Sequence, residues 1–150
     1  MKKQKFAPRK VFEEILEYAV IPTFDLVIEY GGKGVIIARR KIPPYQNKWS
    51  LPGLRILKGE NIEDALTRIA KQELGLKINP KRRKFVGQYT GKFKTEHNRQ
   101  DLSTGDHLKV SSNQPVILNS KHFSAFRITK SIPAGTGAMY KFYLKNFFAR

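Results

Sequence analysis

The segment that most constrains the fold of this chain is GENIEDALTRIAKQELGL, residues 59–76. Asn61 is a good N-cap, and Asp64 three residues later stands in the position of a capping box. Gly75 is the natural residue to end the helix. At about 100° per residue, one arc collects the apolar side chains of Ile62, Ala65, Leu66, Ile69 and Ala70. The spacing predicts an amphipathic helix that begins after Asn61 and ends before Gly75.

One polar residue of this segment breaks the pattern. Glu73 falls about 20° from Ile62 by the same arithmetic, near the centre of the apolar arc. An unpaired carboxylate at such a position is costly to bury. Three interpretations stay open, because buried charges are usually paired or coordinate metals. Glu73 is in a buried or half-buried ion pair, or it reaches solvent from the last turn, or it binds a metal at the edge of the core.

The length and composition fit one domain of the mixed α/β class. The chain has 150 residues, of which 40% are hydrophobic, and its 10 Phe and 6 Tyr exclude a disordered tail. Stretches of helix type and of strand type both occur. No repeat, low-complexity segment or second domain is visible, so residues 1–150 are expected to form a single domain, with 1–8 as a basic N-terminal arm.

The remaining elements are predicted from apolar periodicity and turn residues. Helical spacing predicts helices at 10–19 and 137–148. The strand-like stretches are 24–30, 34–40, 85–93, 107–112, 115–118 and 122–128, of which the first two are joined by Gly31-Gly32 as a hairpin. Residues 94–106 are expected to form a polar loop that is long enough to be functional.

The charge of the chain indicates a polyanionic partner. The 29 Lys and Arg against 12 Asp and Glu give a net charge of +17, with denser basic runs at Lys2–Lys10 and Lys81–Lys84. Such charge favours nucleotides, phosphosugars or nucleic acid. A solvated basic surface without a specific ligand has the same composition, and no RNA- or DNA-binding motif accompanies the charge.

Cysteine is absent from the sequence, which excludes disulfides, zinc-thiolate sites and thiol catalysis. The first ten residues are basic with no apolar run behind them, so no signal peptide is recognisable. No apolar stretch approaches the length of about 18 residues that a membrane span needs. We therefore expect a cytoplasmic protein.

The motifs around the predicted helix follow one another in a distinctive order. KWSLPG precedes the helix, Glu60 stands just before it, and the helix ends in QELGL. This order resembles the signature of the Nudix hydrolase family, G-x5-E-x7-R-E-U-x-E-E-x-G-U, in which U is apolar. The matching positions are Glu60, Arg68, Ala70, Glu73, Gly75 and Leu76. The resemblance covers at least residues 24–76 and implies a Nudix-like α/β/α sandwich with a mixed central sheet.

Three signature positions differ in this chain. Leu54 replaces the first Gly, Ile69 replaces the Glu after the Arg, and Gln72 replaces the first Glu of the closing pair. Of the three helix carboxylates that usually hold divalent metals in the family, Glu73 alone is retained. No Asp or Glu follows Asp106. We therefore expect a degenerate Nudix box in a site poor in carboxylates, unlike a standard pyrophosphatase site.

One branch of the family, the GDP-mannose mannosyl hydrolases, departs in a similar way and is closest in pattern. LPGLRILKGE resembles the P-G-G-R-V-x-K-x-E run of this branch, with Arg55 matching, and Asp25 and Arg40 match residues of its strands. The branch uses one Mg²⁺, attacks the sugar carbon and takes its general base from a His of a downstream loop. His122 lies about where that loop is expected, and His97 is a second candidate.

The resemblance implies a metal site with few protein ligands. One Mg²⁺ or Mn²⁺ would be held by Glu73, by a backbone carbonyl of Gly53 or Leu54, and by Gln72. Water and substrate phosphates would complete the coordination shell.

The resemblance also implies roles for the remaining site residues. In the catalytic set, His122 would deprotonate water, and Arg68 would support Glu60 or the leaving phosphate. The substrate-binding residues would be Arg40, Arg55 and Asp25. Each arginine would contact phosphate through both arms of its guanidinium group, while Asp25 would orient a sugar hydroxyl.

Two hypotheses for the function follow. The first is a metal-dependent Nudix-type hydrolase that acts on a nucleoside-diphosphate sugar, as the GDP-mannose mannosyl hydrolases do, or on a related nucleotide. The second is a catalytically degenerate Nudix-fold protein that binds nucleotide or RNA without hydrolysis, which the missing acids and the charge of +17 favour. The related branch also suggests a homodimer, and no membrane partner is expected.

Overall fold

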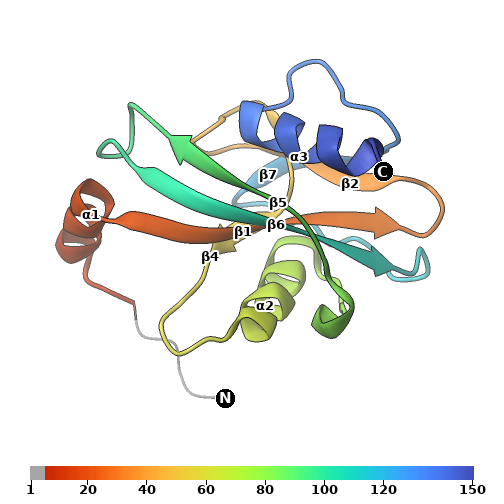
Figure 1. Ribbon diagram of the computed structural model, residues 1–150, viewed down its shortest axis with the longest axis horizontal. Helices are drawn as coiled ribbons and strands as arrows, with labels where there is room; N and C mark the ends of the chain where they lie inside the picture. Colours follow the sequence, from red (N-terminus) through yellow and green to blue (C-terminus); the bar gives the residue numbers. More distant parts are fainter. Residues whose placement is uncertain (1–5) are drawn as a thin grey trace.

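The computed structural model describes residues 6–150, so the first five residues of the predicted basic arm lie outside the described residues. Within this range a mixed sheet has helices on both faces, which is the expected α/β/α sandwich (Figure 1). The helices are α1 (Arg9–Tyr18), α2 (Ile62–Leu74) and α3 (Ala138–Phe148), with a 3₁₀ turn at Pro80–Arg82. The strands are β1 (Val20–Tyr30), β2 (Val35–Arg40), β3 (Trp49–Ser50), β4 (Gly53–Arg55), β5 (Lys84–Lys92), β6 (Gln100–Val110) and β7 (Phe123–Thr129).

Two long parallel strands form the middle of the sheet. β1 and β6 pair along their whole length, from Val20 beside Gln100 to Tyr30 beside Val110. The order across the sheet is β3-β2-β1-β6-β5, while β4 pairs with β1 and β7 pairs with β2. β4 pairs with Thr23–Asp25 of β1, on the edge of β1 opposite β6. The three strands therefore meet around this part of β1, where the candidate site lies.

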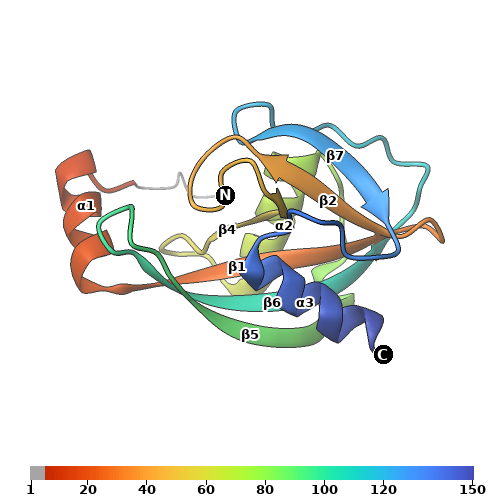
Figure 2. The same cartoon turned by 90° about the horizontal axis from the view of Figure 1, so that it is seen from above.

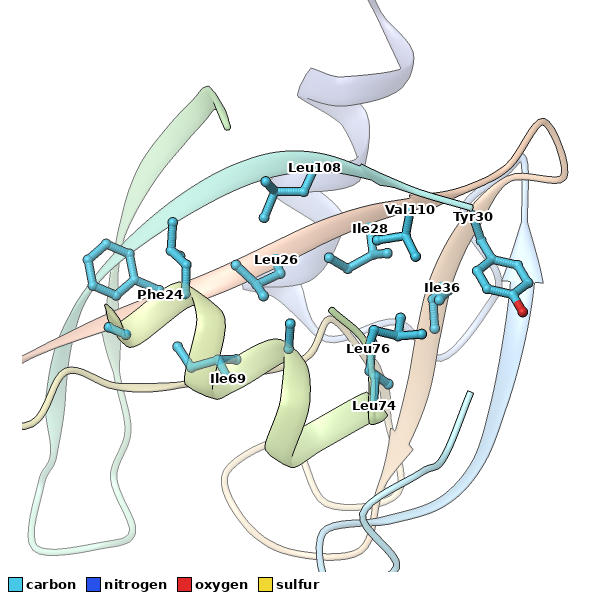
Figure 3. Packing of buried hydrophobic residues seen from close by; sticks show 13 residues of the cluster. Phe24, Leu26, Ile28, Tyr30, Ile36, Ile69, Leu74, Leu76, Leu108 and Val110 are labelled. Carbon is cyan, nitrogen blue, oxygen red and sulfur yellow. The ribbon is translucent and has the colours of Figure 1, made fainter. Parts of the chain in front are cut away.

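Helix α2 covers one face of the sheet and α3 covers the other. Figure 3 shows Ile69 and Leu74 of α2 packed beneath Leu26 and Ile28 of β1. All four side chains are fully buried, and each contributes about 2 kcal/mol through removal from water. The alternate residue Val27 faces the second core, which α3 forms with Met139, Tyr140, Tyr143 and Leu144.

The capping residues of α2 act as the sequence predicts. The Asp64 N–H donates to Oδ1 of Asn61 over 2.8 Å, and the Asn61 N–H donates to Oδ2 of Asp64 over 3.3 Å. Gly75 takes the left-handed conformation with φ of 66°, and its N–H donates to the Lys71 carbonyl. A Cβ atom at Gly75 would lie 2.8 Å from Ile117. The predicted bounds of this helix are confirmed.

Most of the other predicted elements are confirmed with shifted ends. The predicted helices at 10–19 and 137–148 are α1 and α3, and the predicted hairpin is β1 and β2, with Glu29 opposite Val35. β1 begins four residues before its predicted start, at Val20. The stretches 85–93 and 122–128 correspond to β5 and β7.

The prediction for residues 94–118 is wrong in two places. Most of the expected polar loop belongs to β6, which runs without a break into the stretch 107–112 as far as Val110. Residues 115–118 form no strand; the Ile117 N–H donates to the Leu74 carbonyl, and Val116 and Leu118 pack against the core under α2. Polar residues hide the strand periodicity of β6 because buried positions such as Asp101 and Ser103 carry polar side chains.

Within the described part of the chain, no helix is long and apolar enough to cross a membrane.

Candidate functional site

A cleft of about 180 Å³ opens where β1, β4 and β6 meet the C-terminal end of α2. Its walls also include the loop after β2, the tip of the β5–β6 hairpin and the start of α3. Seven acidic, basic or histidine side chains line it, namely Asp25, Arg40, Arg55, Glu73, Arg99, Asp101 and His122. Five of these are among the residues that the sequence predicts for the site, and the structure brings them together.

Glu73 is held in a buried hydrogen-bonded pair with His122. Its two carboxylate oxygens lie 2.9 and 3.0 Å from Nδ1 of His122, and the Asn119 side-chain amide donates to Oε1 over 3.2 Å. Only 1% of Glu73 is exposed. The interpretation that Glu73 reaches solvent is therefore wrong, and the carboxylate is paired as the energetics of burial require.

His122 is fixed on both its backbone and its ring. Its N–H donates to the Asn119 carbonyl over 3.1 Å, and its own carbonyl accepts from the Lys41 N–H over 2.7 Å. Since Nδ1 faces Glu73, Nε2 is the ring nitrogen left for a ligand in the cleft. The other sequence-predicted base, His97, lies outside the cleft, with its Nε2 4.0 Å from Glu13.

Asp25 is buried at the floor of the cleft and is hydrogen-bonded from behind. Ser103 Oγ donates to Oδ2 of Asp25 over 2.5 Å and lies 2.7 Å from the Tyr143 hydroxyl of α3. A Cβ atom on Gly53 would lie 2.2 Å from Oδ1 of Asp25, so a glycine is required beside this carboxylate. Burial raises the pKa of Asp25 to about 7, against the opposing effects of the Ser103 hydrogen bond and the Arg40 charge.

The Asp25→Asn variant is expected to lose part of the pH dependence of stability. Because the pKa of Asp25 is about 7 in the folded protein and 3.8 in the ordinary carboxyl, the folded state binds a proton that the unfolded chain has released. The stability from this proton is complete below about pH 4 and is lost by about pH 7, a change of up to about 4 kcal/mol. Urea unfolding of both proteins in EDTA should show the variant gaining relative stability as pH rises; parallel pH curves would contradict the assignment.

The three arginines of the cleft are held in different ways. Arg40 donates from Nε to the Pro44 carbonyl, and Arg99 donates from Nε to Asp101 over 2.6 Å. Arg55 stacks on the Phe12 ring of α1, with 4.3 Å from its Cζ to the ring centroid. Within residues 6–150 its guanidinium forms no hydrogen bond or ion pair, and burial, followed by the charges of two neighbouring arginines, lowers its pKa. A half-buried cation without an acidic partner is suited to an anionic ligand.

Glu60 and Arg68 form a paired unit behind the cleft. Arg68 donates from Nε to Oε2 of Glu60 over 2.7 Å and from Nη2 to Oε1 over 2.9 Å, and Nη2 also donates to the Arg55 carbonyl over 2.8 Å. Although burial acts to raise the pKa of Glu60, the hydrogen bonds from Arg68 and the Leu57 N–H and the Arg68 charge lower it overall. Neither side chain lines the cleft. The pair joins α2 to β4 and so positions Arg55.

Replacing Arg68 with methionine is expected to destabilise the fold. The Glu60 side chain is 4% exposed, so the variant leaves a buried carboxylate without its cation and lowers the free energy of unfolding by about 3 kcal/mol. The matched control is Arg9→Met, because Arg9 also pairs with a glutamate but is 91% exposed; little change is expected there. Equal losses in chemical denaturation of the two variants would contradict the structural role of the Glu60 pair.

A model of the NUDIX domain matches residues 21–129. The chain belongs to the Nudix family. The predicted class of Nudix hydrolase is confirmed by this match. Helix α1, residues 130–137 and helix α3 lie outside the matched range. Both flanking helices nevertheless contact the site, α1 through Phe12 and α3 through Tyr143.

Similar proteins agree with this family. The low-salt glycan biosynthesis protein Agl8 of Haloferax volcanii is 30% identical over 124 residues, which are 81% of this chain and 67% of Agl8. The MutT protein of Methanosarcina mazei shares the fold with a TM-score of 0.70 at 15% identity, over 85% of this chain and 92% of that one. A bifunctional NMN adenylyltransferase/ADP ribose pyrophosphatase of Francisella tularensis, in complex with AMP and a Mn ion, gives a TM-score of 0.59 at 13% identity. The superposition covers 85% of this chain and 38% of that one.

The Nudix fold implies a divalent metal, and the oxygen atoms of the cleft fit one with few protein ligands. Glu73, Asp25, Gly53 and Leu54 line the same cleft, and oxygen is the donor that Mg²⁺ and Mn²⁺ take. Across residues 6–150, no three His, Asp or Glu side chains group closely enough to hold an ion by themselves. The cleft therefore fits an ion with a shell completed by water and phosphate. Gln72, predicted as a ligand, is exposed and hydrogen-bonded to Arg68 outside the cleft.

Arg99, Asp101 and Tyr140 line the Nudix cleft but were not among the residues predicted for the site. Arg99 and Asp101 fall in the stretch interpreted as a loop, and Tyr140 falls in a helix interpreted only as amphipathic. With Asp101 the cleft has three carboxylates, one more than the sequence analysis places there. Burial raises the pKa of Asp101, against the hydrogen bond and charge of Arg99. The buried alternate positions of β6 are Asp101, Ser103, Gly105 and His107, which are polar or small, so the sequence has no apolar alternation there to predict a strand.

Proposed function

We propose that this Nudix domain is a metal-dependent hydrolase of a nucleoside-diphosphate sugar, of the GDP-mannose mannosyl hydrolase type. The observation that carries the proposal is one cleft in which three arginines meet the Glu73–His122 pair. The arginines suit a diphosphate, and the pair suits the removal of a proton from water. The name of Agl8, a glycan biosynthesis protein, supports a sugar-containing substrate.

The diphosphate is bound by the guanidinium groups. Arg55 contributes the largest share, since its charge is half-buried and stacked on Phe12 without an acidic partner. Arg40 and Arg99 face the same cleft and complete a cationic wall. Planar guanidinium groups bind phosphate through paired hydrogen bonds, so the wall orients the substrate as well as attracting it.

The sugar is oriented by the two remaining carboxyl groups. Asp25 and Asp101 line the same cleft and have oxygens that accept hydrogen bonds from hydroxyl groups. Ser103 and Arg99 hold the two carboxyls from behind. Hydroxyl recognition by fixed acceptors distinguishes a sugar from a simple alkyl leaving group.

His122 accepts the proton of the attacking water at Nε2. Glu73 accepts the Nδ1–H, which fixes the ring tautomer and stabilises the protonated ring. Glu73 and a carbonyl of Gly53 or Leu54 would also hold the divalent ion, which neutralises the diphosphate leaving group when bound. A carboxylate has two oxygens with about four acceptor positions, so Glu73 has capacity for both contacts.

The test is turnover of a panel of nucleoside-diphosphate sugars with Mg²⁺ or Mn²⁺ in water enriched in ¹⁸O. Attack at the sugar carbon places the label in the released sugar, whereas attack at phosphorus places it in the released phosphate. Label in the sugar supports the proposal. Label in phosphate would overturn the mannosyl-hydrolase mechanism, and binding of nucleotide or RNA without any turnover would favour the degenerate binding protein instead.

A further inference from the structure

A second hollow lies on the face of the sheet that α2 covers, between the first turn of this helix and the edge strand β5. Its volume is about 490 Å³, within the range of about 300 to 1,000 Å³ that is typical of small-molecule sites. None of its lining residues lines the cleft described above. Figures 1 and 2 show α2 and α3 on opposite sides of the sheet, and Asp25 at the floor of the cleft lies on the α3 side, where Ser103 joins it to Tyr143. This α2-face hollow is therefore separate from the cleft.

Asp106 of β6 is the most deeply buried residue of the hollow, with 4% of its surface exposed. It lies beside Leu26 in the β1–β6 pair, and Leu26 packs under α2, so the two side chains point to the same side of the sheet. Across residues 6–150 its carboxyl group accepts no hydrogen bond and forms no ion pair, and burial raises its pKa against the charge of Arg83. A buried carboxylate without donors is costly, so a ligand that donates N–H groups here would be stabilising.

An exposed aromatic ring forms the wall next to this carboxyl group. Phe85 lies opposite Asp106 in the β5–β6 pair and is 61% exposed, because α2 packs against β1 and β4 and leaves β5 uncovered on this face. Thr104 also lines the hollow, and its Oγ1 accepts from the Gln88 amide over 3.2 Å, which leaves the hydroxyl hydrogen free to donate. A flat ring with N–H groups at its edge fits this arrangement, since it can stack on Phe85 while its edge meets the carboxylate.

The rim of the hollow is basic and belongs to the Lys81–Lys84 run. Arg83 donates to the Pro80 carbonyl over 2.8 Å and lies 3.7 Å from Glu63, the second acid of the hollow. The Lys81 side chain lines the hollow and, within the described chain, forms no hydrogen bond or ion pair. A free ammonium group at the rim suits a phosphate.

The charges around the hollow favour an anionic ligand. The hollow itself has two acids and two bases, so its own charges balance. The neighbouring surface adds the bases Arg82, Lys84 and Lys109 and no acid. The surrounding potential is therefore positive and opposes a cationic ligand such as an amine or a guanidinium group.

We propose that the α2-face hollow binds a guanine nucleotide, with the edge of the base on Asp106, its ring on Phe85 and its phosphate on Lys81. Guanine has an N1–H and an N2–H₂ group side by side, so it can donate two parallel hydrogen bonds to one carboxylate. Adenine has an acceptor, N1, beside its amino group and leaves one carboxylate oxygen facing a lone pair. This site is distinct from the cleft and adds a second ligand to the proposed hydrolase.

A titration of the ¹⁵N-labelled whole chain with GMP, followed by NMR in EDTA, tests the proposal. The amide signals of Phe85 and Thr104 report the hollow, and those of Arg55 and His122 report the cleft, so the two sites are read separately. The hollow signals should saturate at a GMP concentration about tenfold lower than with AMP or inorganic phosphate. Equal affinity for AMP would overturn the recognition of guanine, and equal affinity for inorganic phosphate would show an adventitious ion only. A titration without shifts at the hollow would overturn the site itself.

Two variants of the hollow test the assigned contacts. Asp106→Asn should weaken GMP at the hollow about tenfold, because an amide N–H₂ group then faces the donors of the base. Phe85→Ala should do the same through lost stacking, and its fold should be unaffected because the ring is exposed. The matched control is Phe126→Ala, since Phe126 is an exposed aromatic residue of β7 outside the hollow, and its GMP affinity should equal that of the wild type.

Unchanged GMP affinity in both hollow variants would contradict the proposal. The readout is binding at the hollow, so it is independent of whether the proposed hydrolysis in the cleft is found.

Discussion

Glu73→Gln is expected to abolish metal-dependent turnover, with kcat lowered by about three orders of magnitude or more. The amide keeps the size of the carboxylate but removes the negative charge that pairs with His122 and would hold the ion. It also places an N–H₂ group in a pocket where Asn119 and His122 already approach the same oxygens. Steady-state kinetics with a metal titration measure the effect, and circular dichroism checks that the variant is folded.

Glu63→Gln is the matched control, because Glu63 lies in the same helix but its side chain is 42% exposed and paired only loosely with Arg83 at 3.7 Å. Its activity should equal that of the wild type. Full activity of Glu73→Gln with an unchanged metal requirement would show that the proposed site is wrong.

His122→Ala is expected to slow turnover by about 10² to 10⁴ while leaving metal affinity within a few-fold of the wild type. The reason is that the imidazole acts on the proton of water, whereas Glu73 is a carboxylate with or without its histidine partner. Binding of Mn²⁺ measured by calorimetry and turnover measured on the same samples separate the two effects. Added imidazole should restore part of the rate.

His97→Ala serves as the control for histidine loss, since His97 lies on the β5–β6 hairpin and contacts Glu13 of α1 rather than the cleft. If His97→Ala slowed the reaction as much as His122→Ala, the base would be misassigned. A large loss of metal affinity in His122→Ala would instead make the histidine a ligand.

Local signals in the sequence were sufficient for the elements that depend on local chemistry. Asn61, Asp64 and Gly75 determine the ends of α2 through hydrogen bonds within a few residues, and the structure has these bonds. The family resemblance then placed Asp25, Arg40, Arg55 and His122 around one site, which the structure brings together. The catalytic and binding roles of these residues stay predictions.

Long-range packing explains what the sequence did not predict. Asp101 and Ser103 look like loop residues because they are polar, yet they are buried where β6 crosses the cleft. Gly105 also looks like a turn residue, but a Cβ atom there would lie 2.5 Å from the Tyr143 ring of α3. Ser103 and Gly105 contact partners about 40 to 80 residues away in the chain, which no local sequence pattern contains.

The parallel pairing of β1 with β6 has a consequence for how the protein comes to be folded. Paired residues such as Val20 and Gln100 are separated by most of the chain, and closing so large a loop carries an entropic cost before any contact rewards it. During synthesis, the edge of β1 that pairs with β6 therefore stays unpaired until β6 has left the ribosome. Since Ser103 and Tyr143 reach Asp25 only after this step, the chain acquires its central sheet and its reactive geometry late and together.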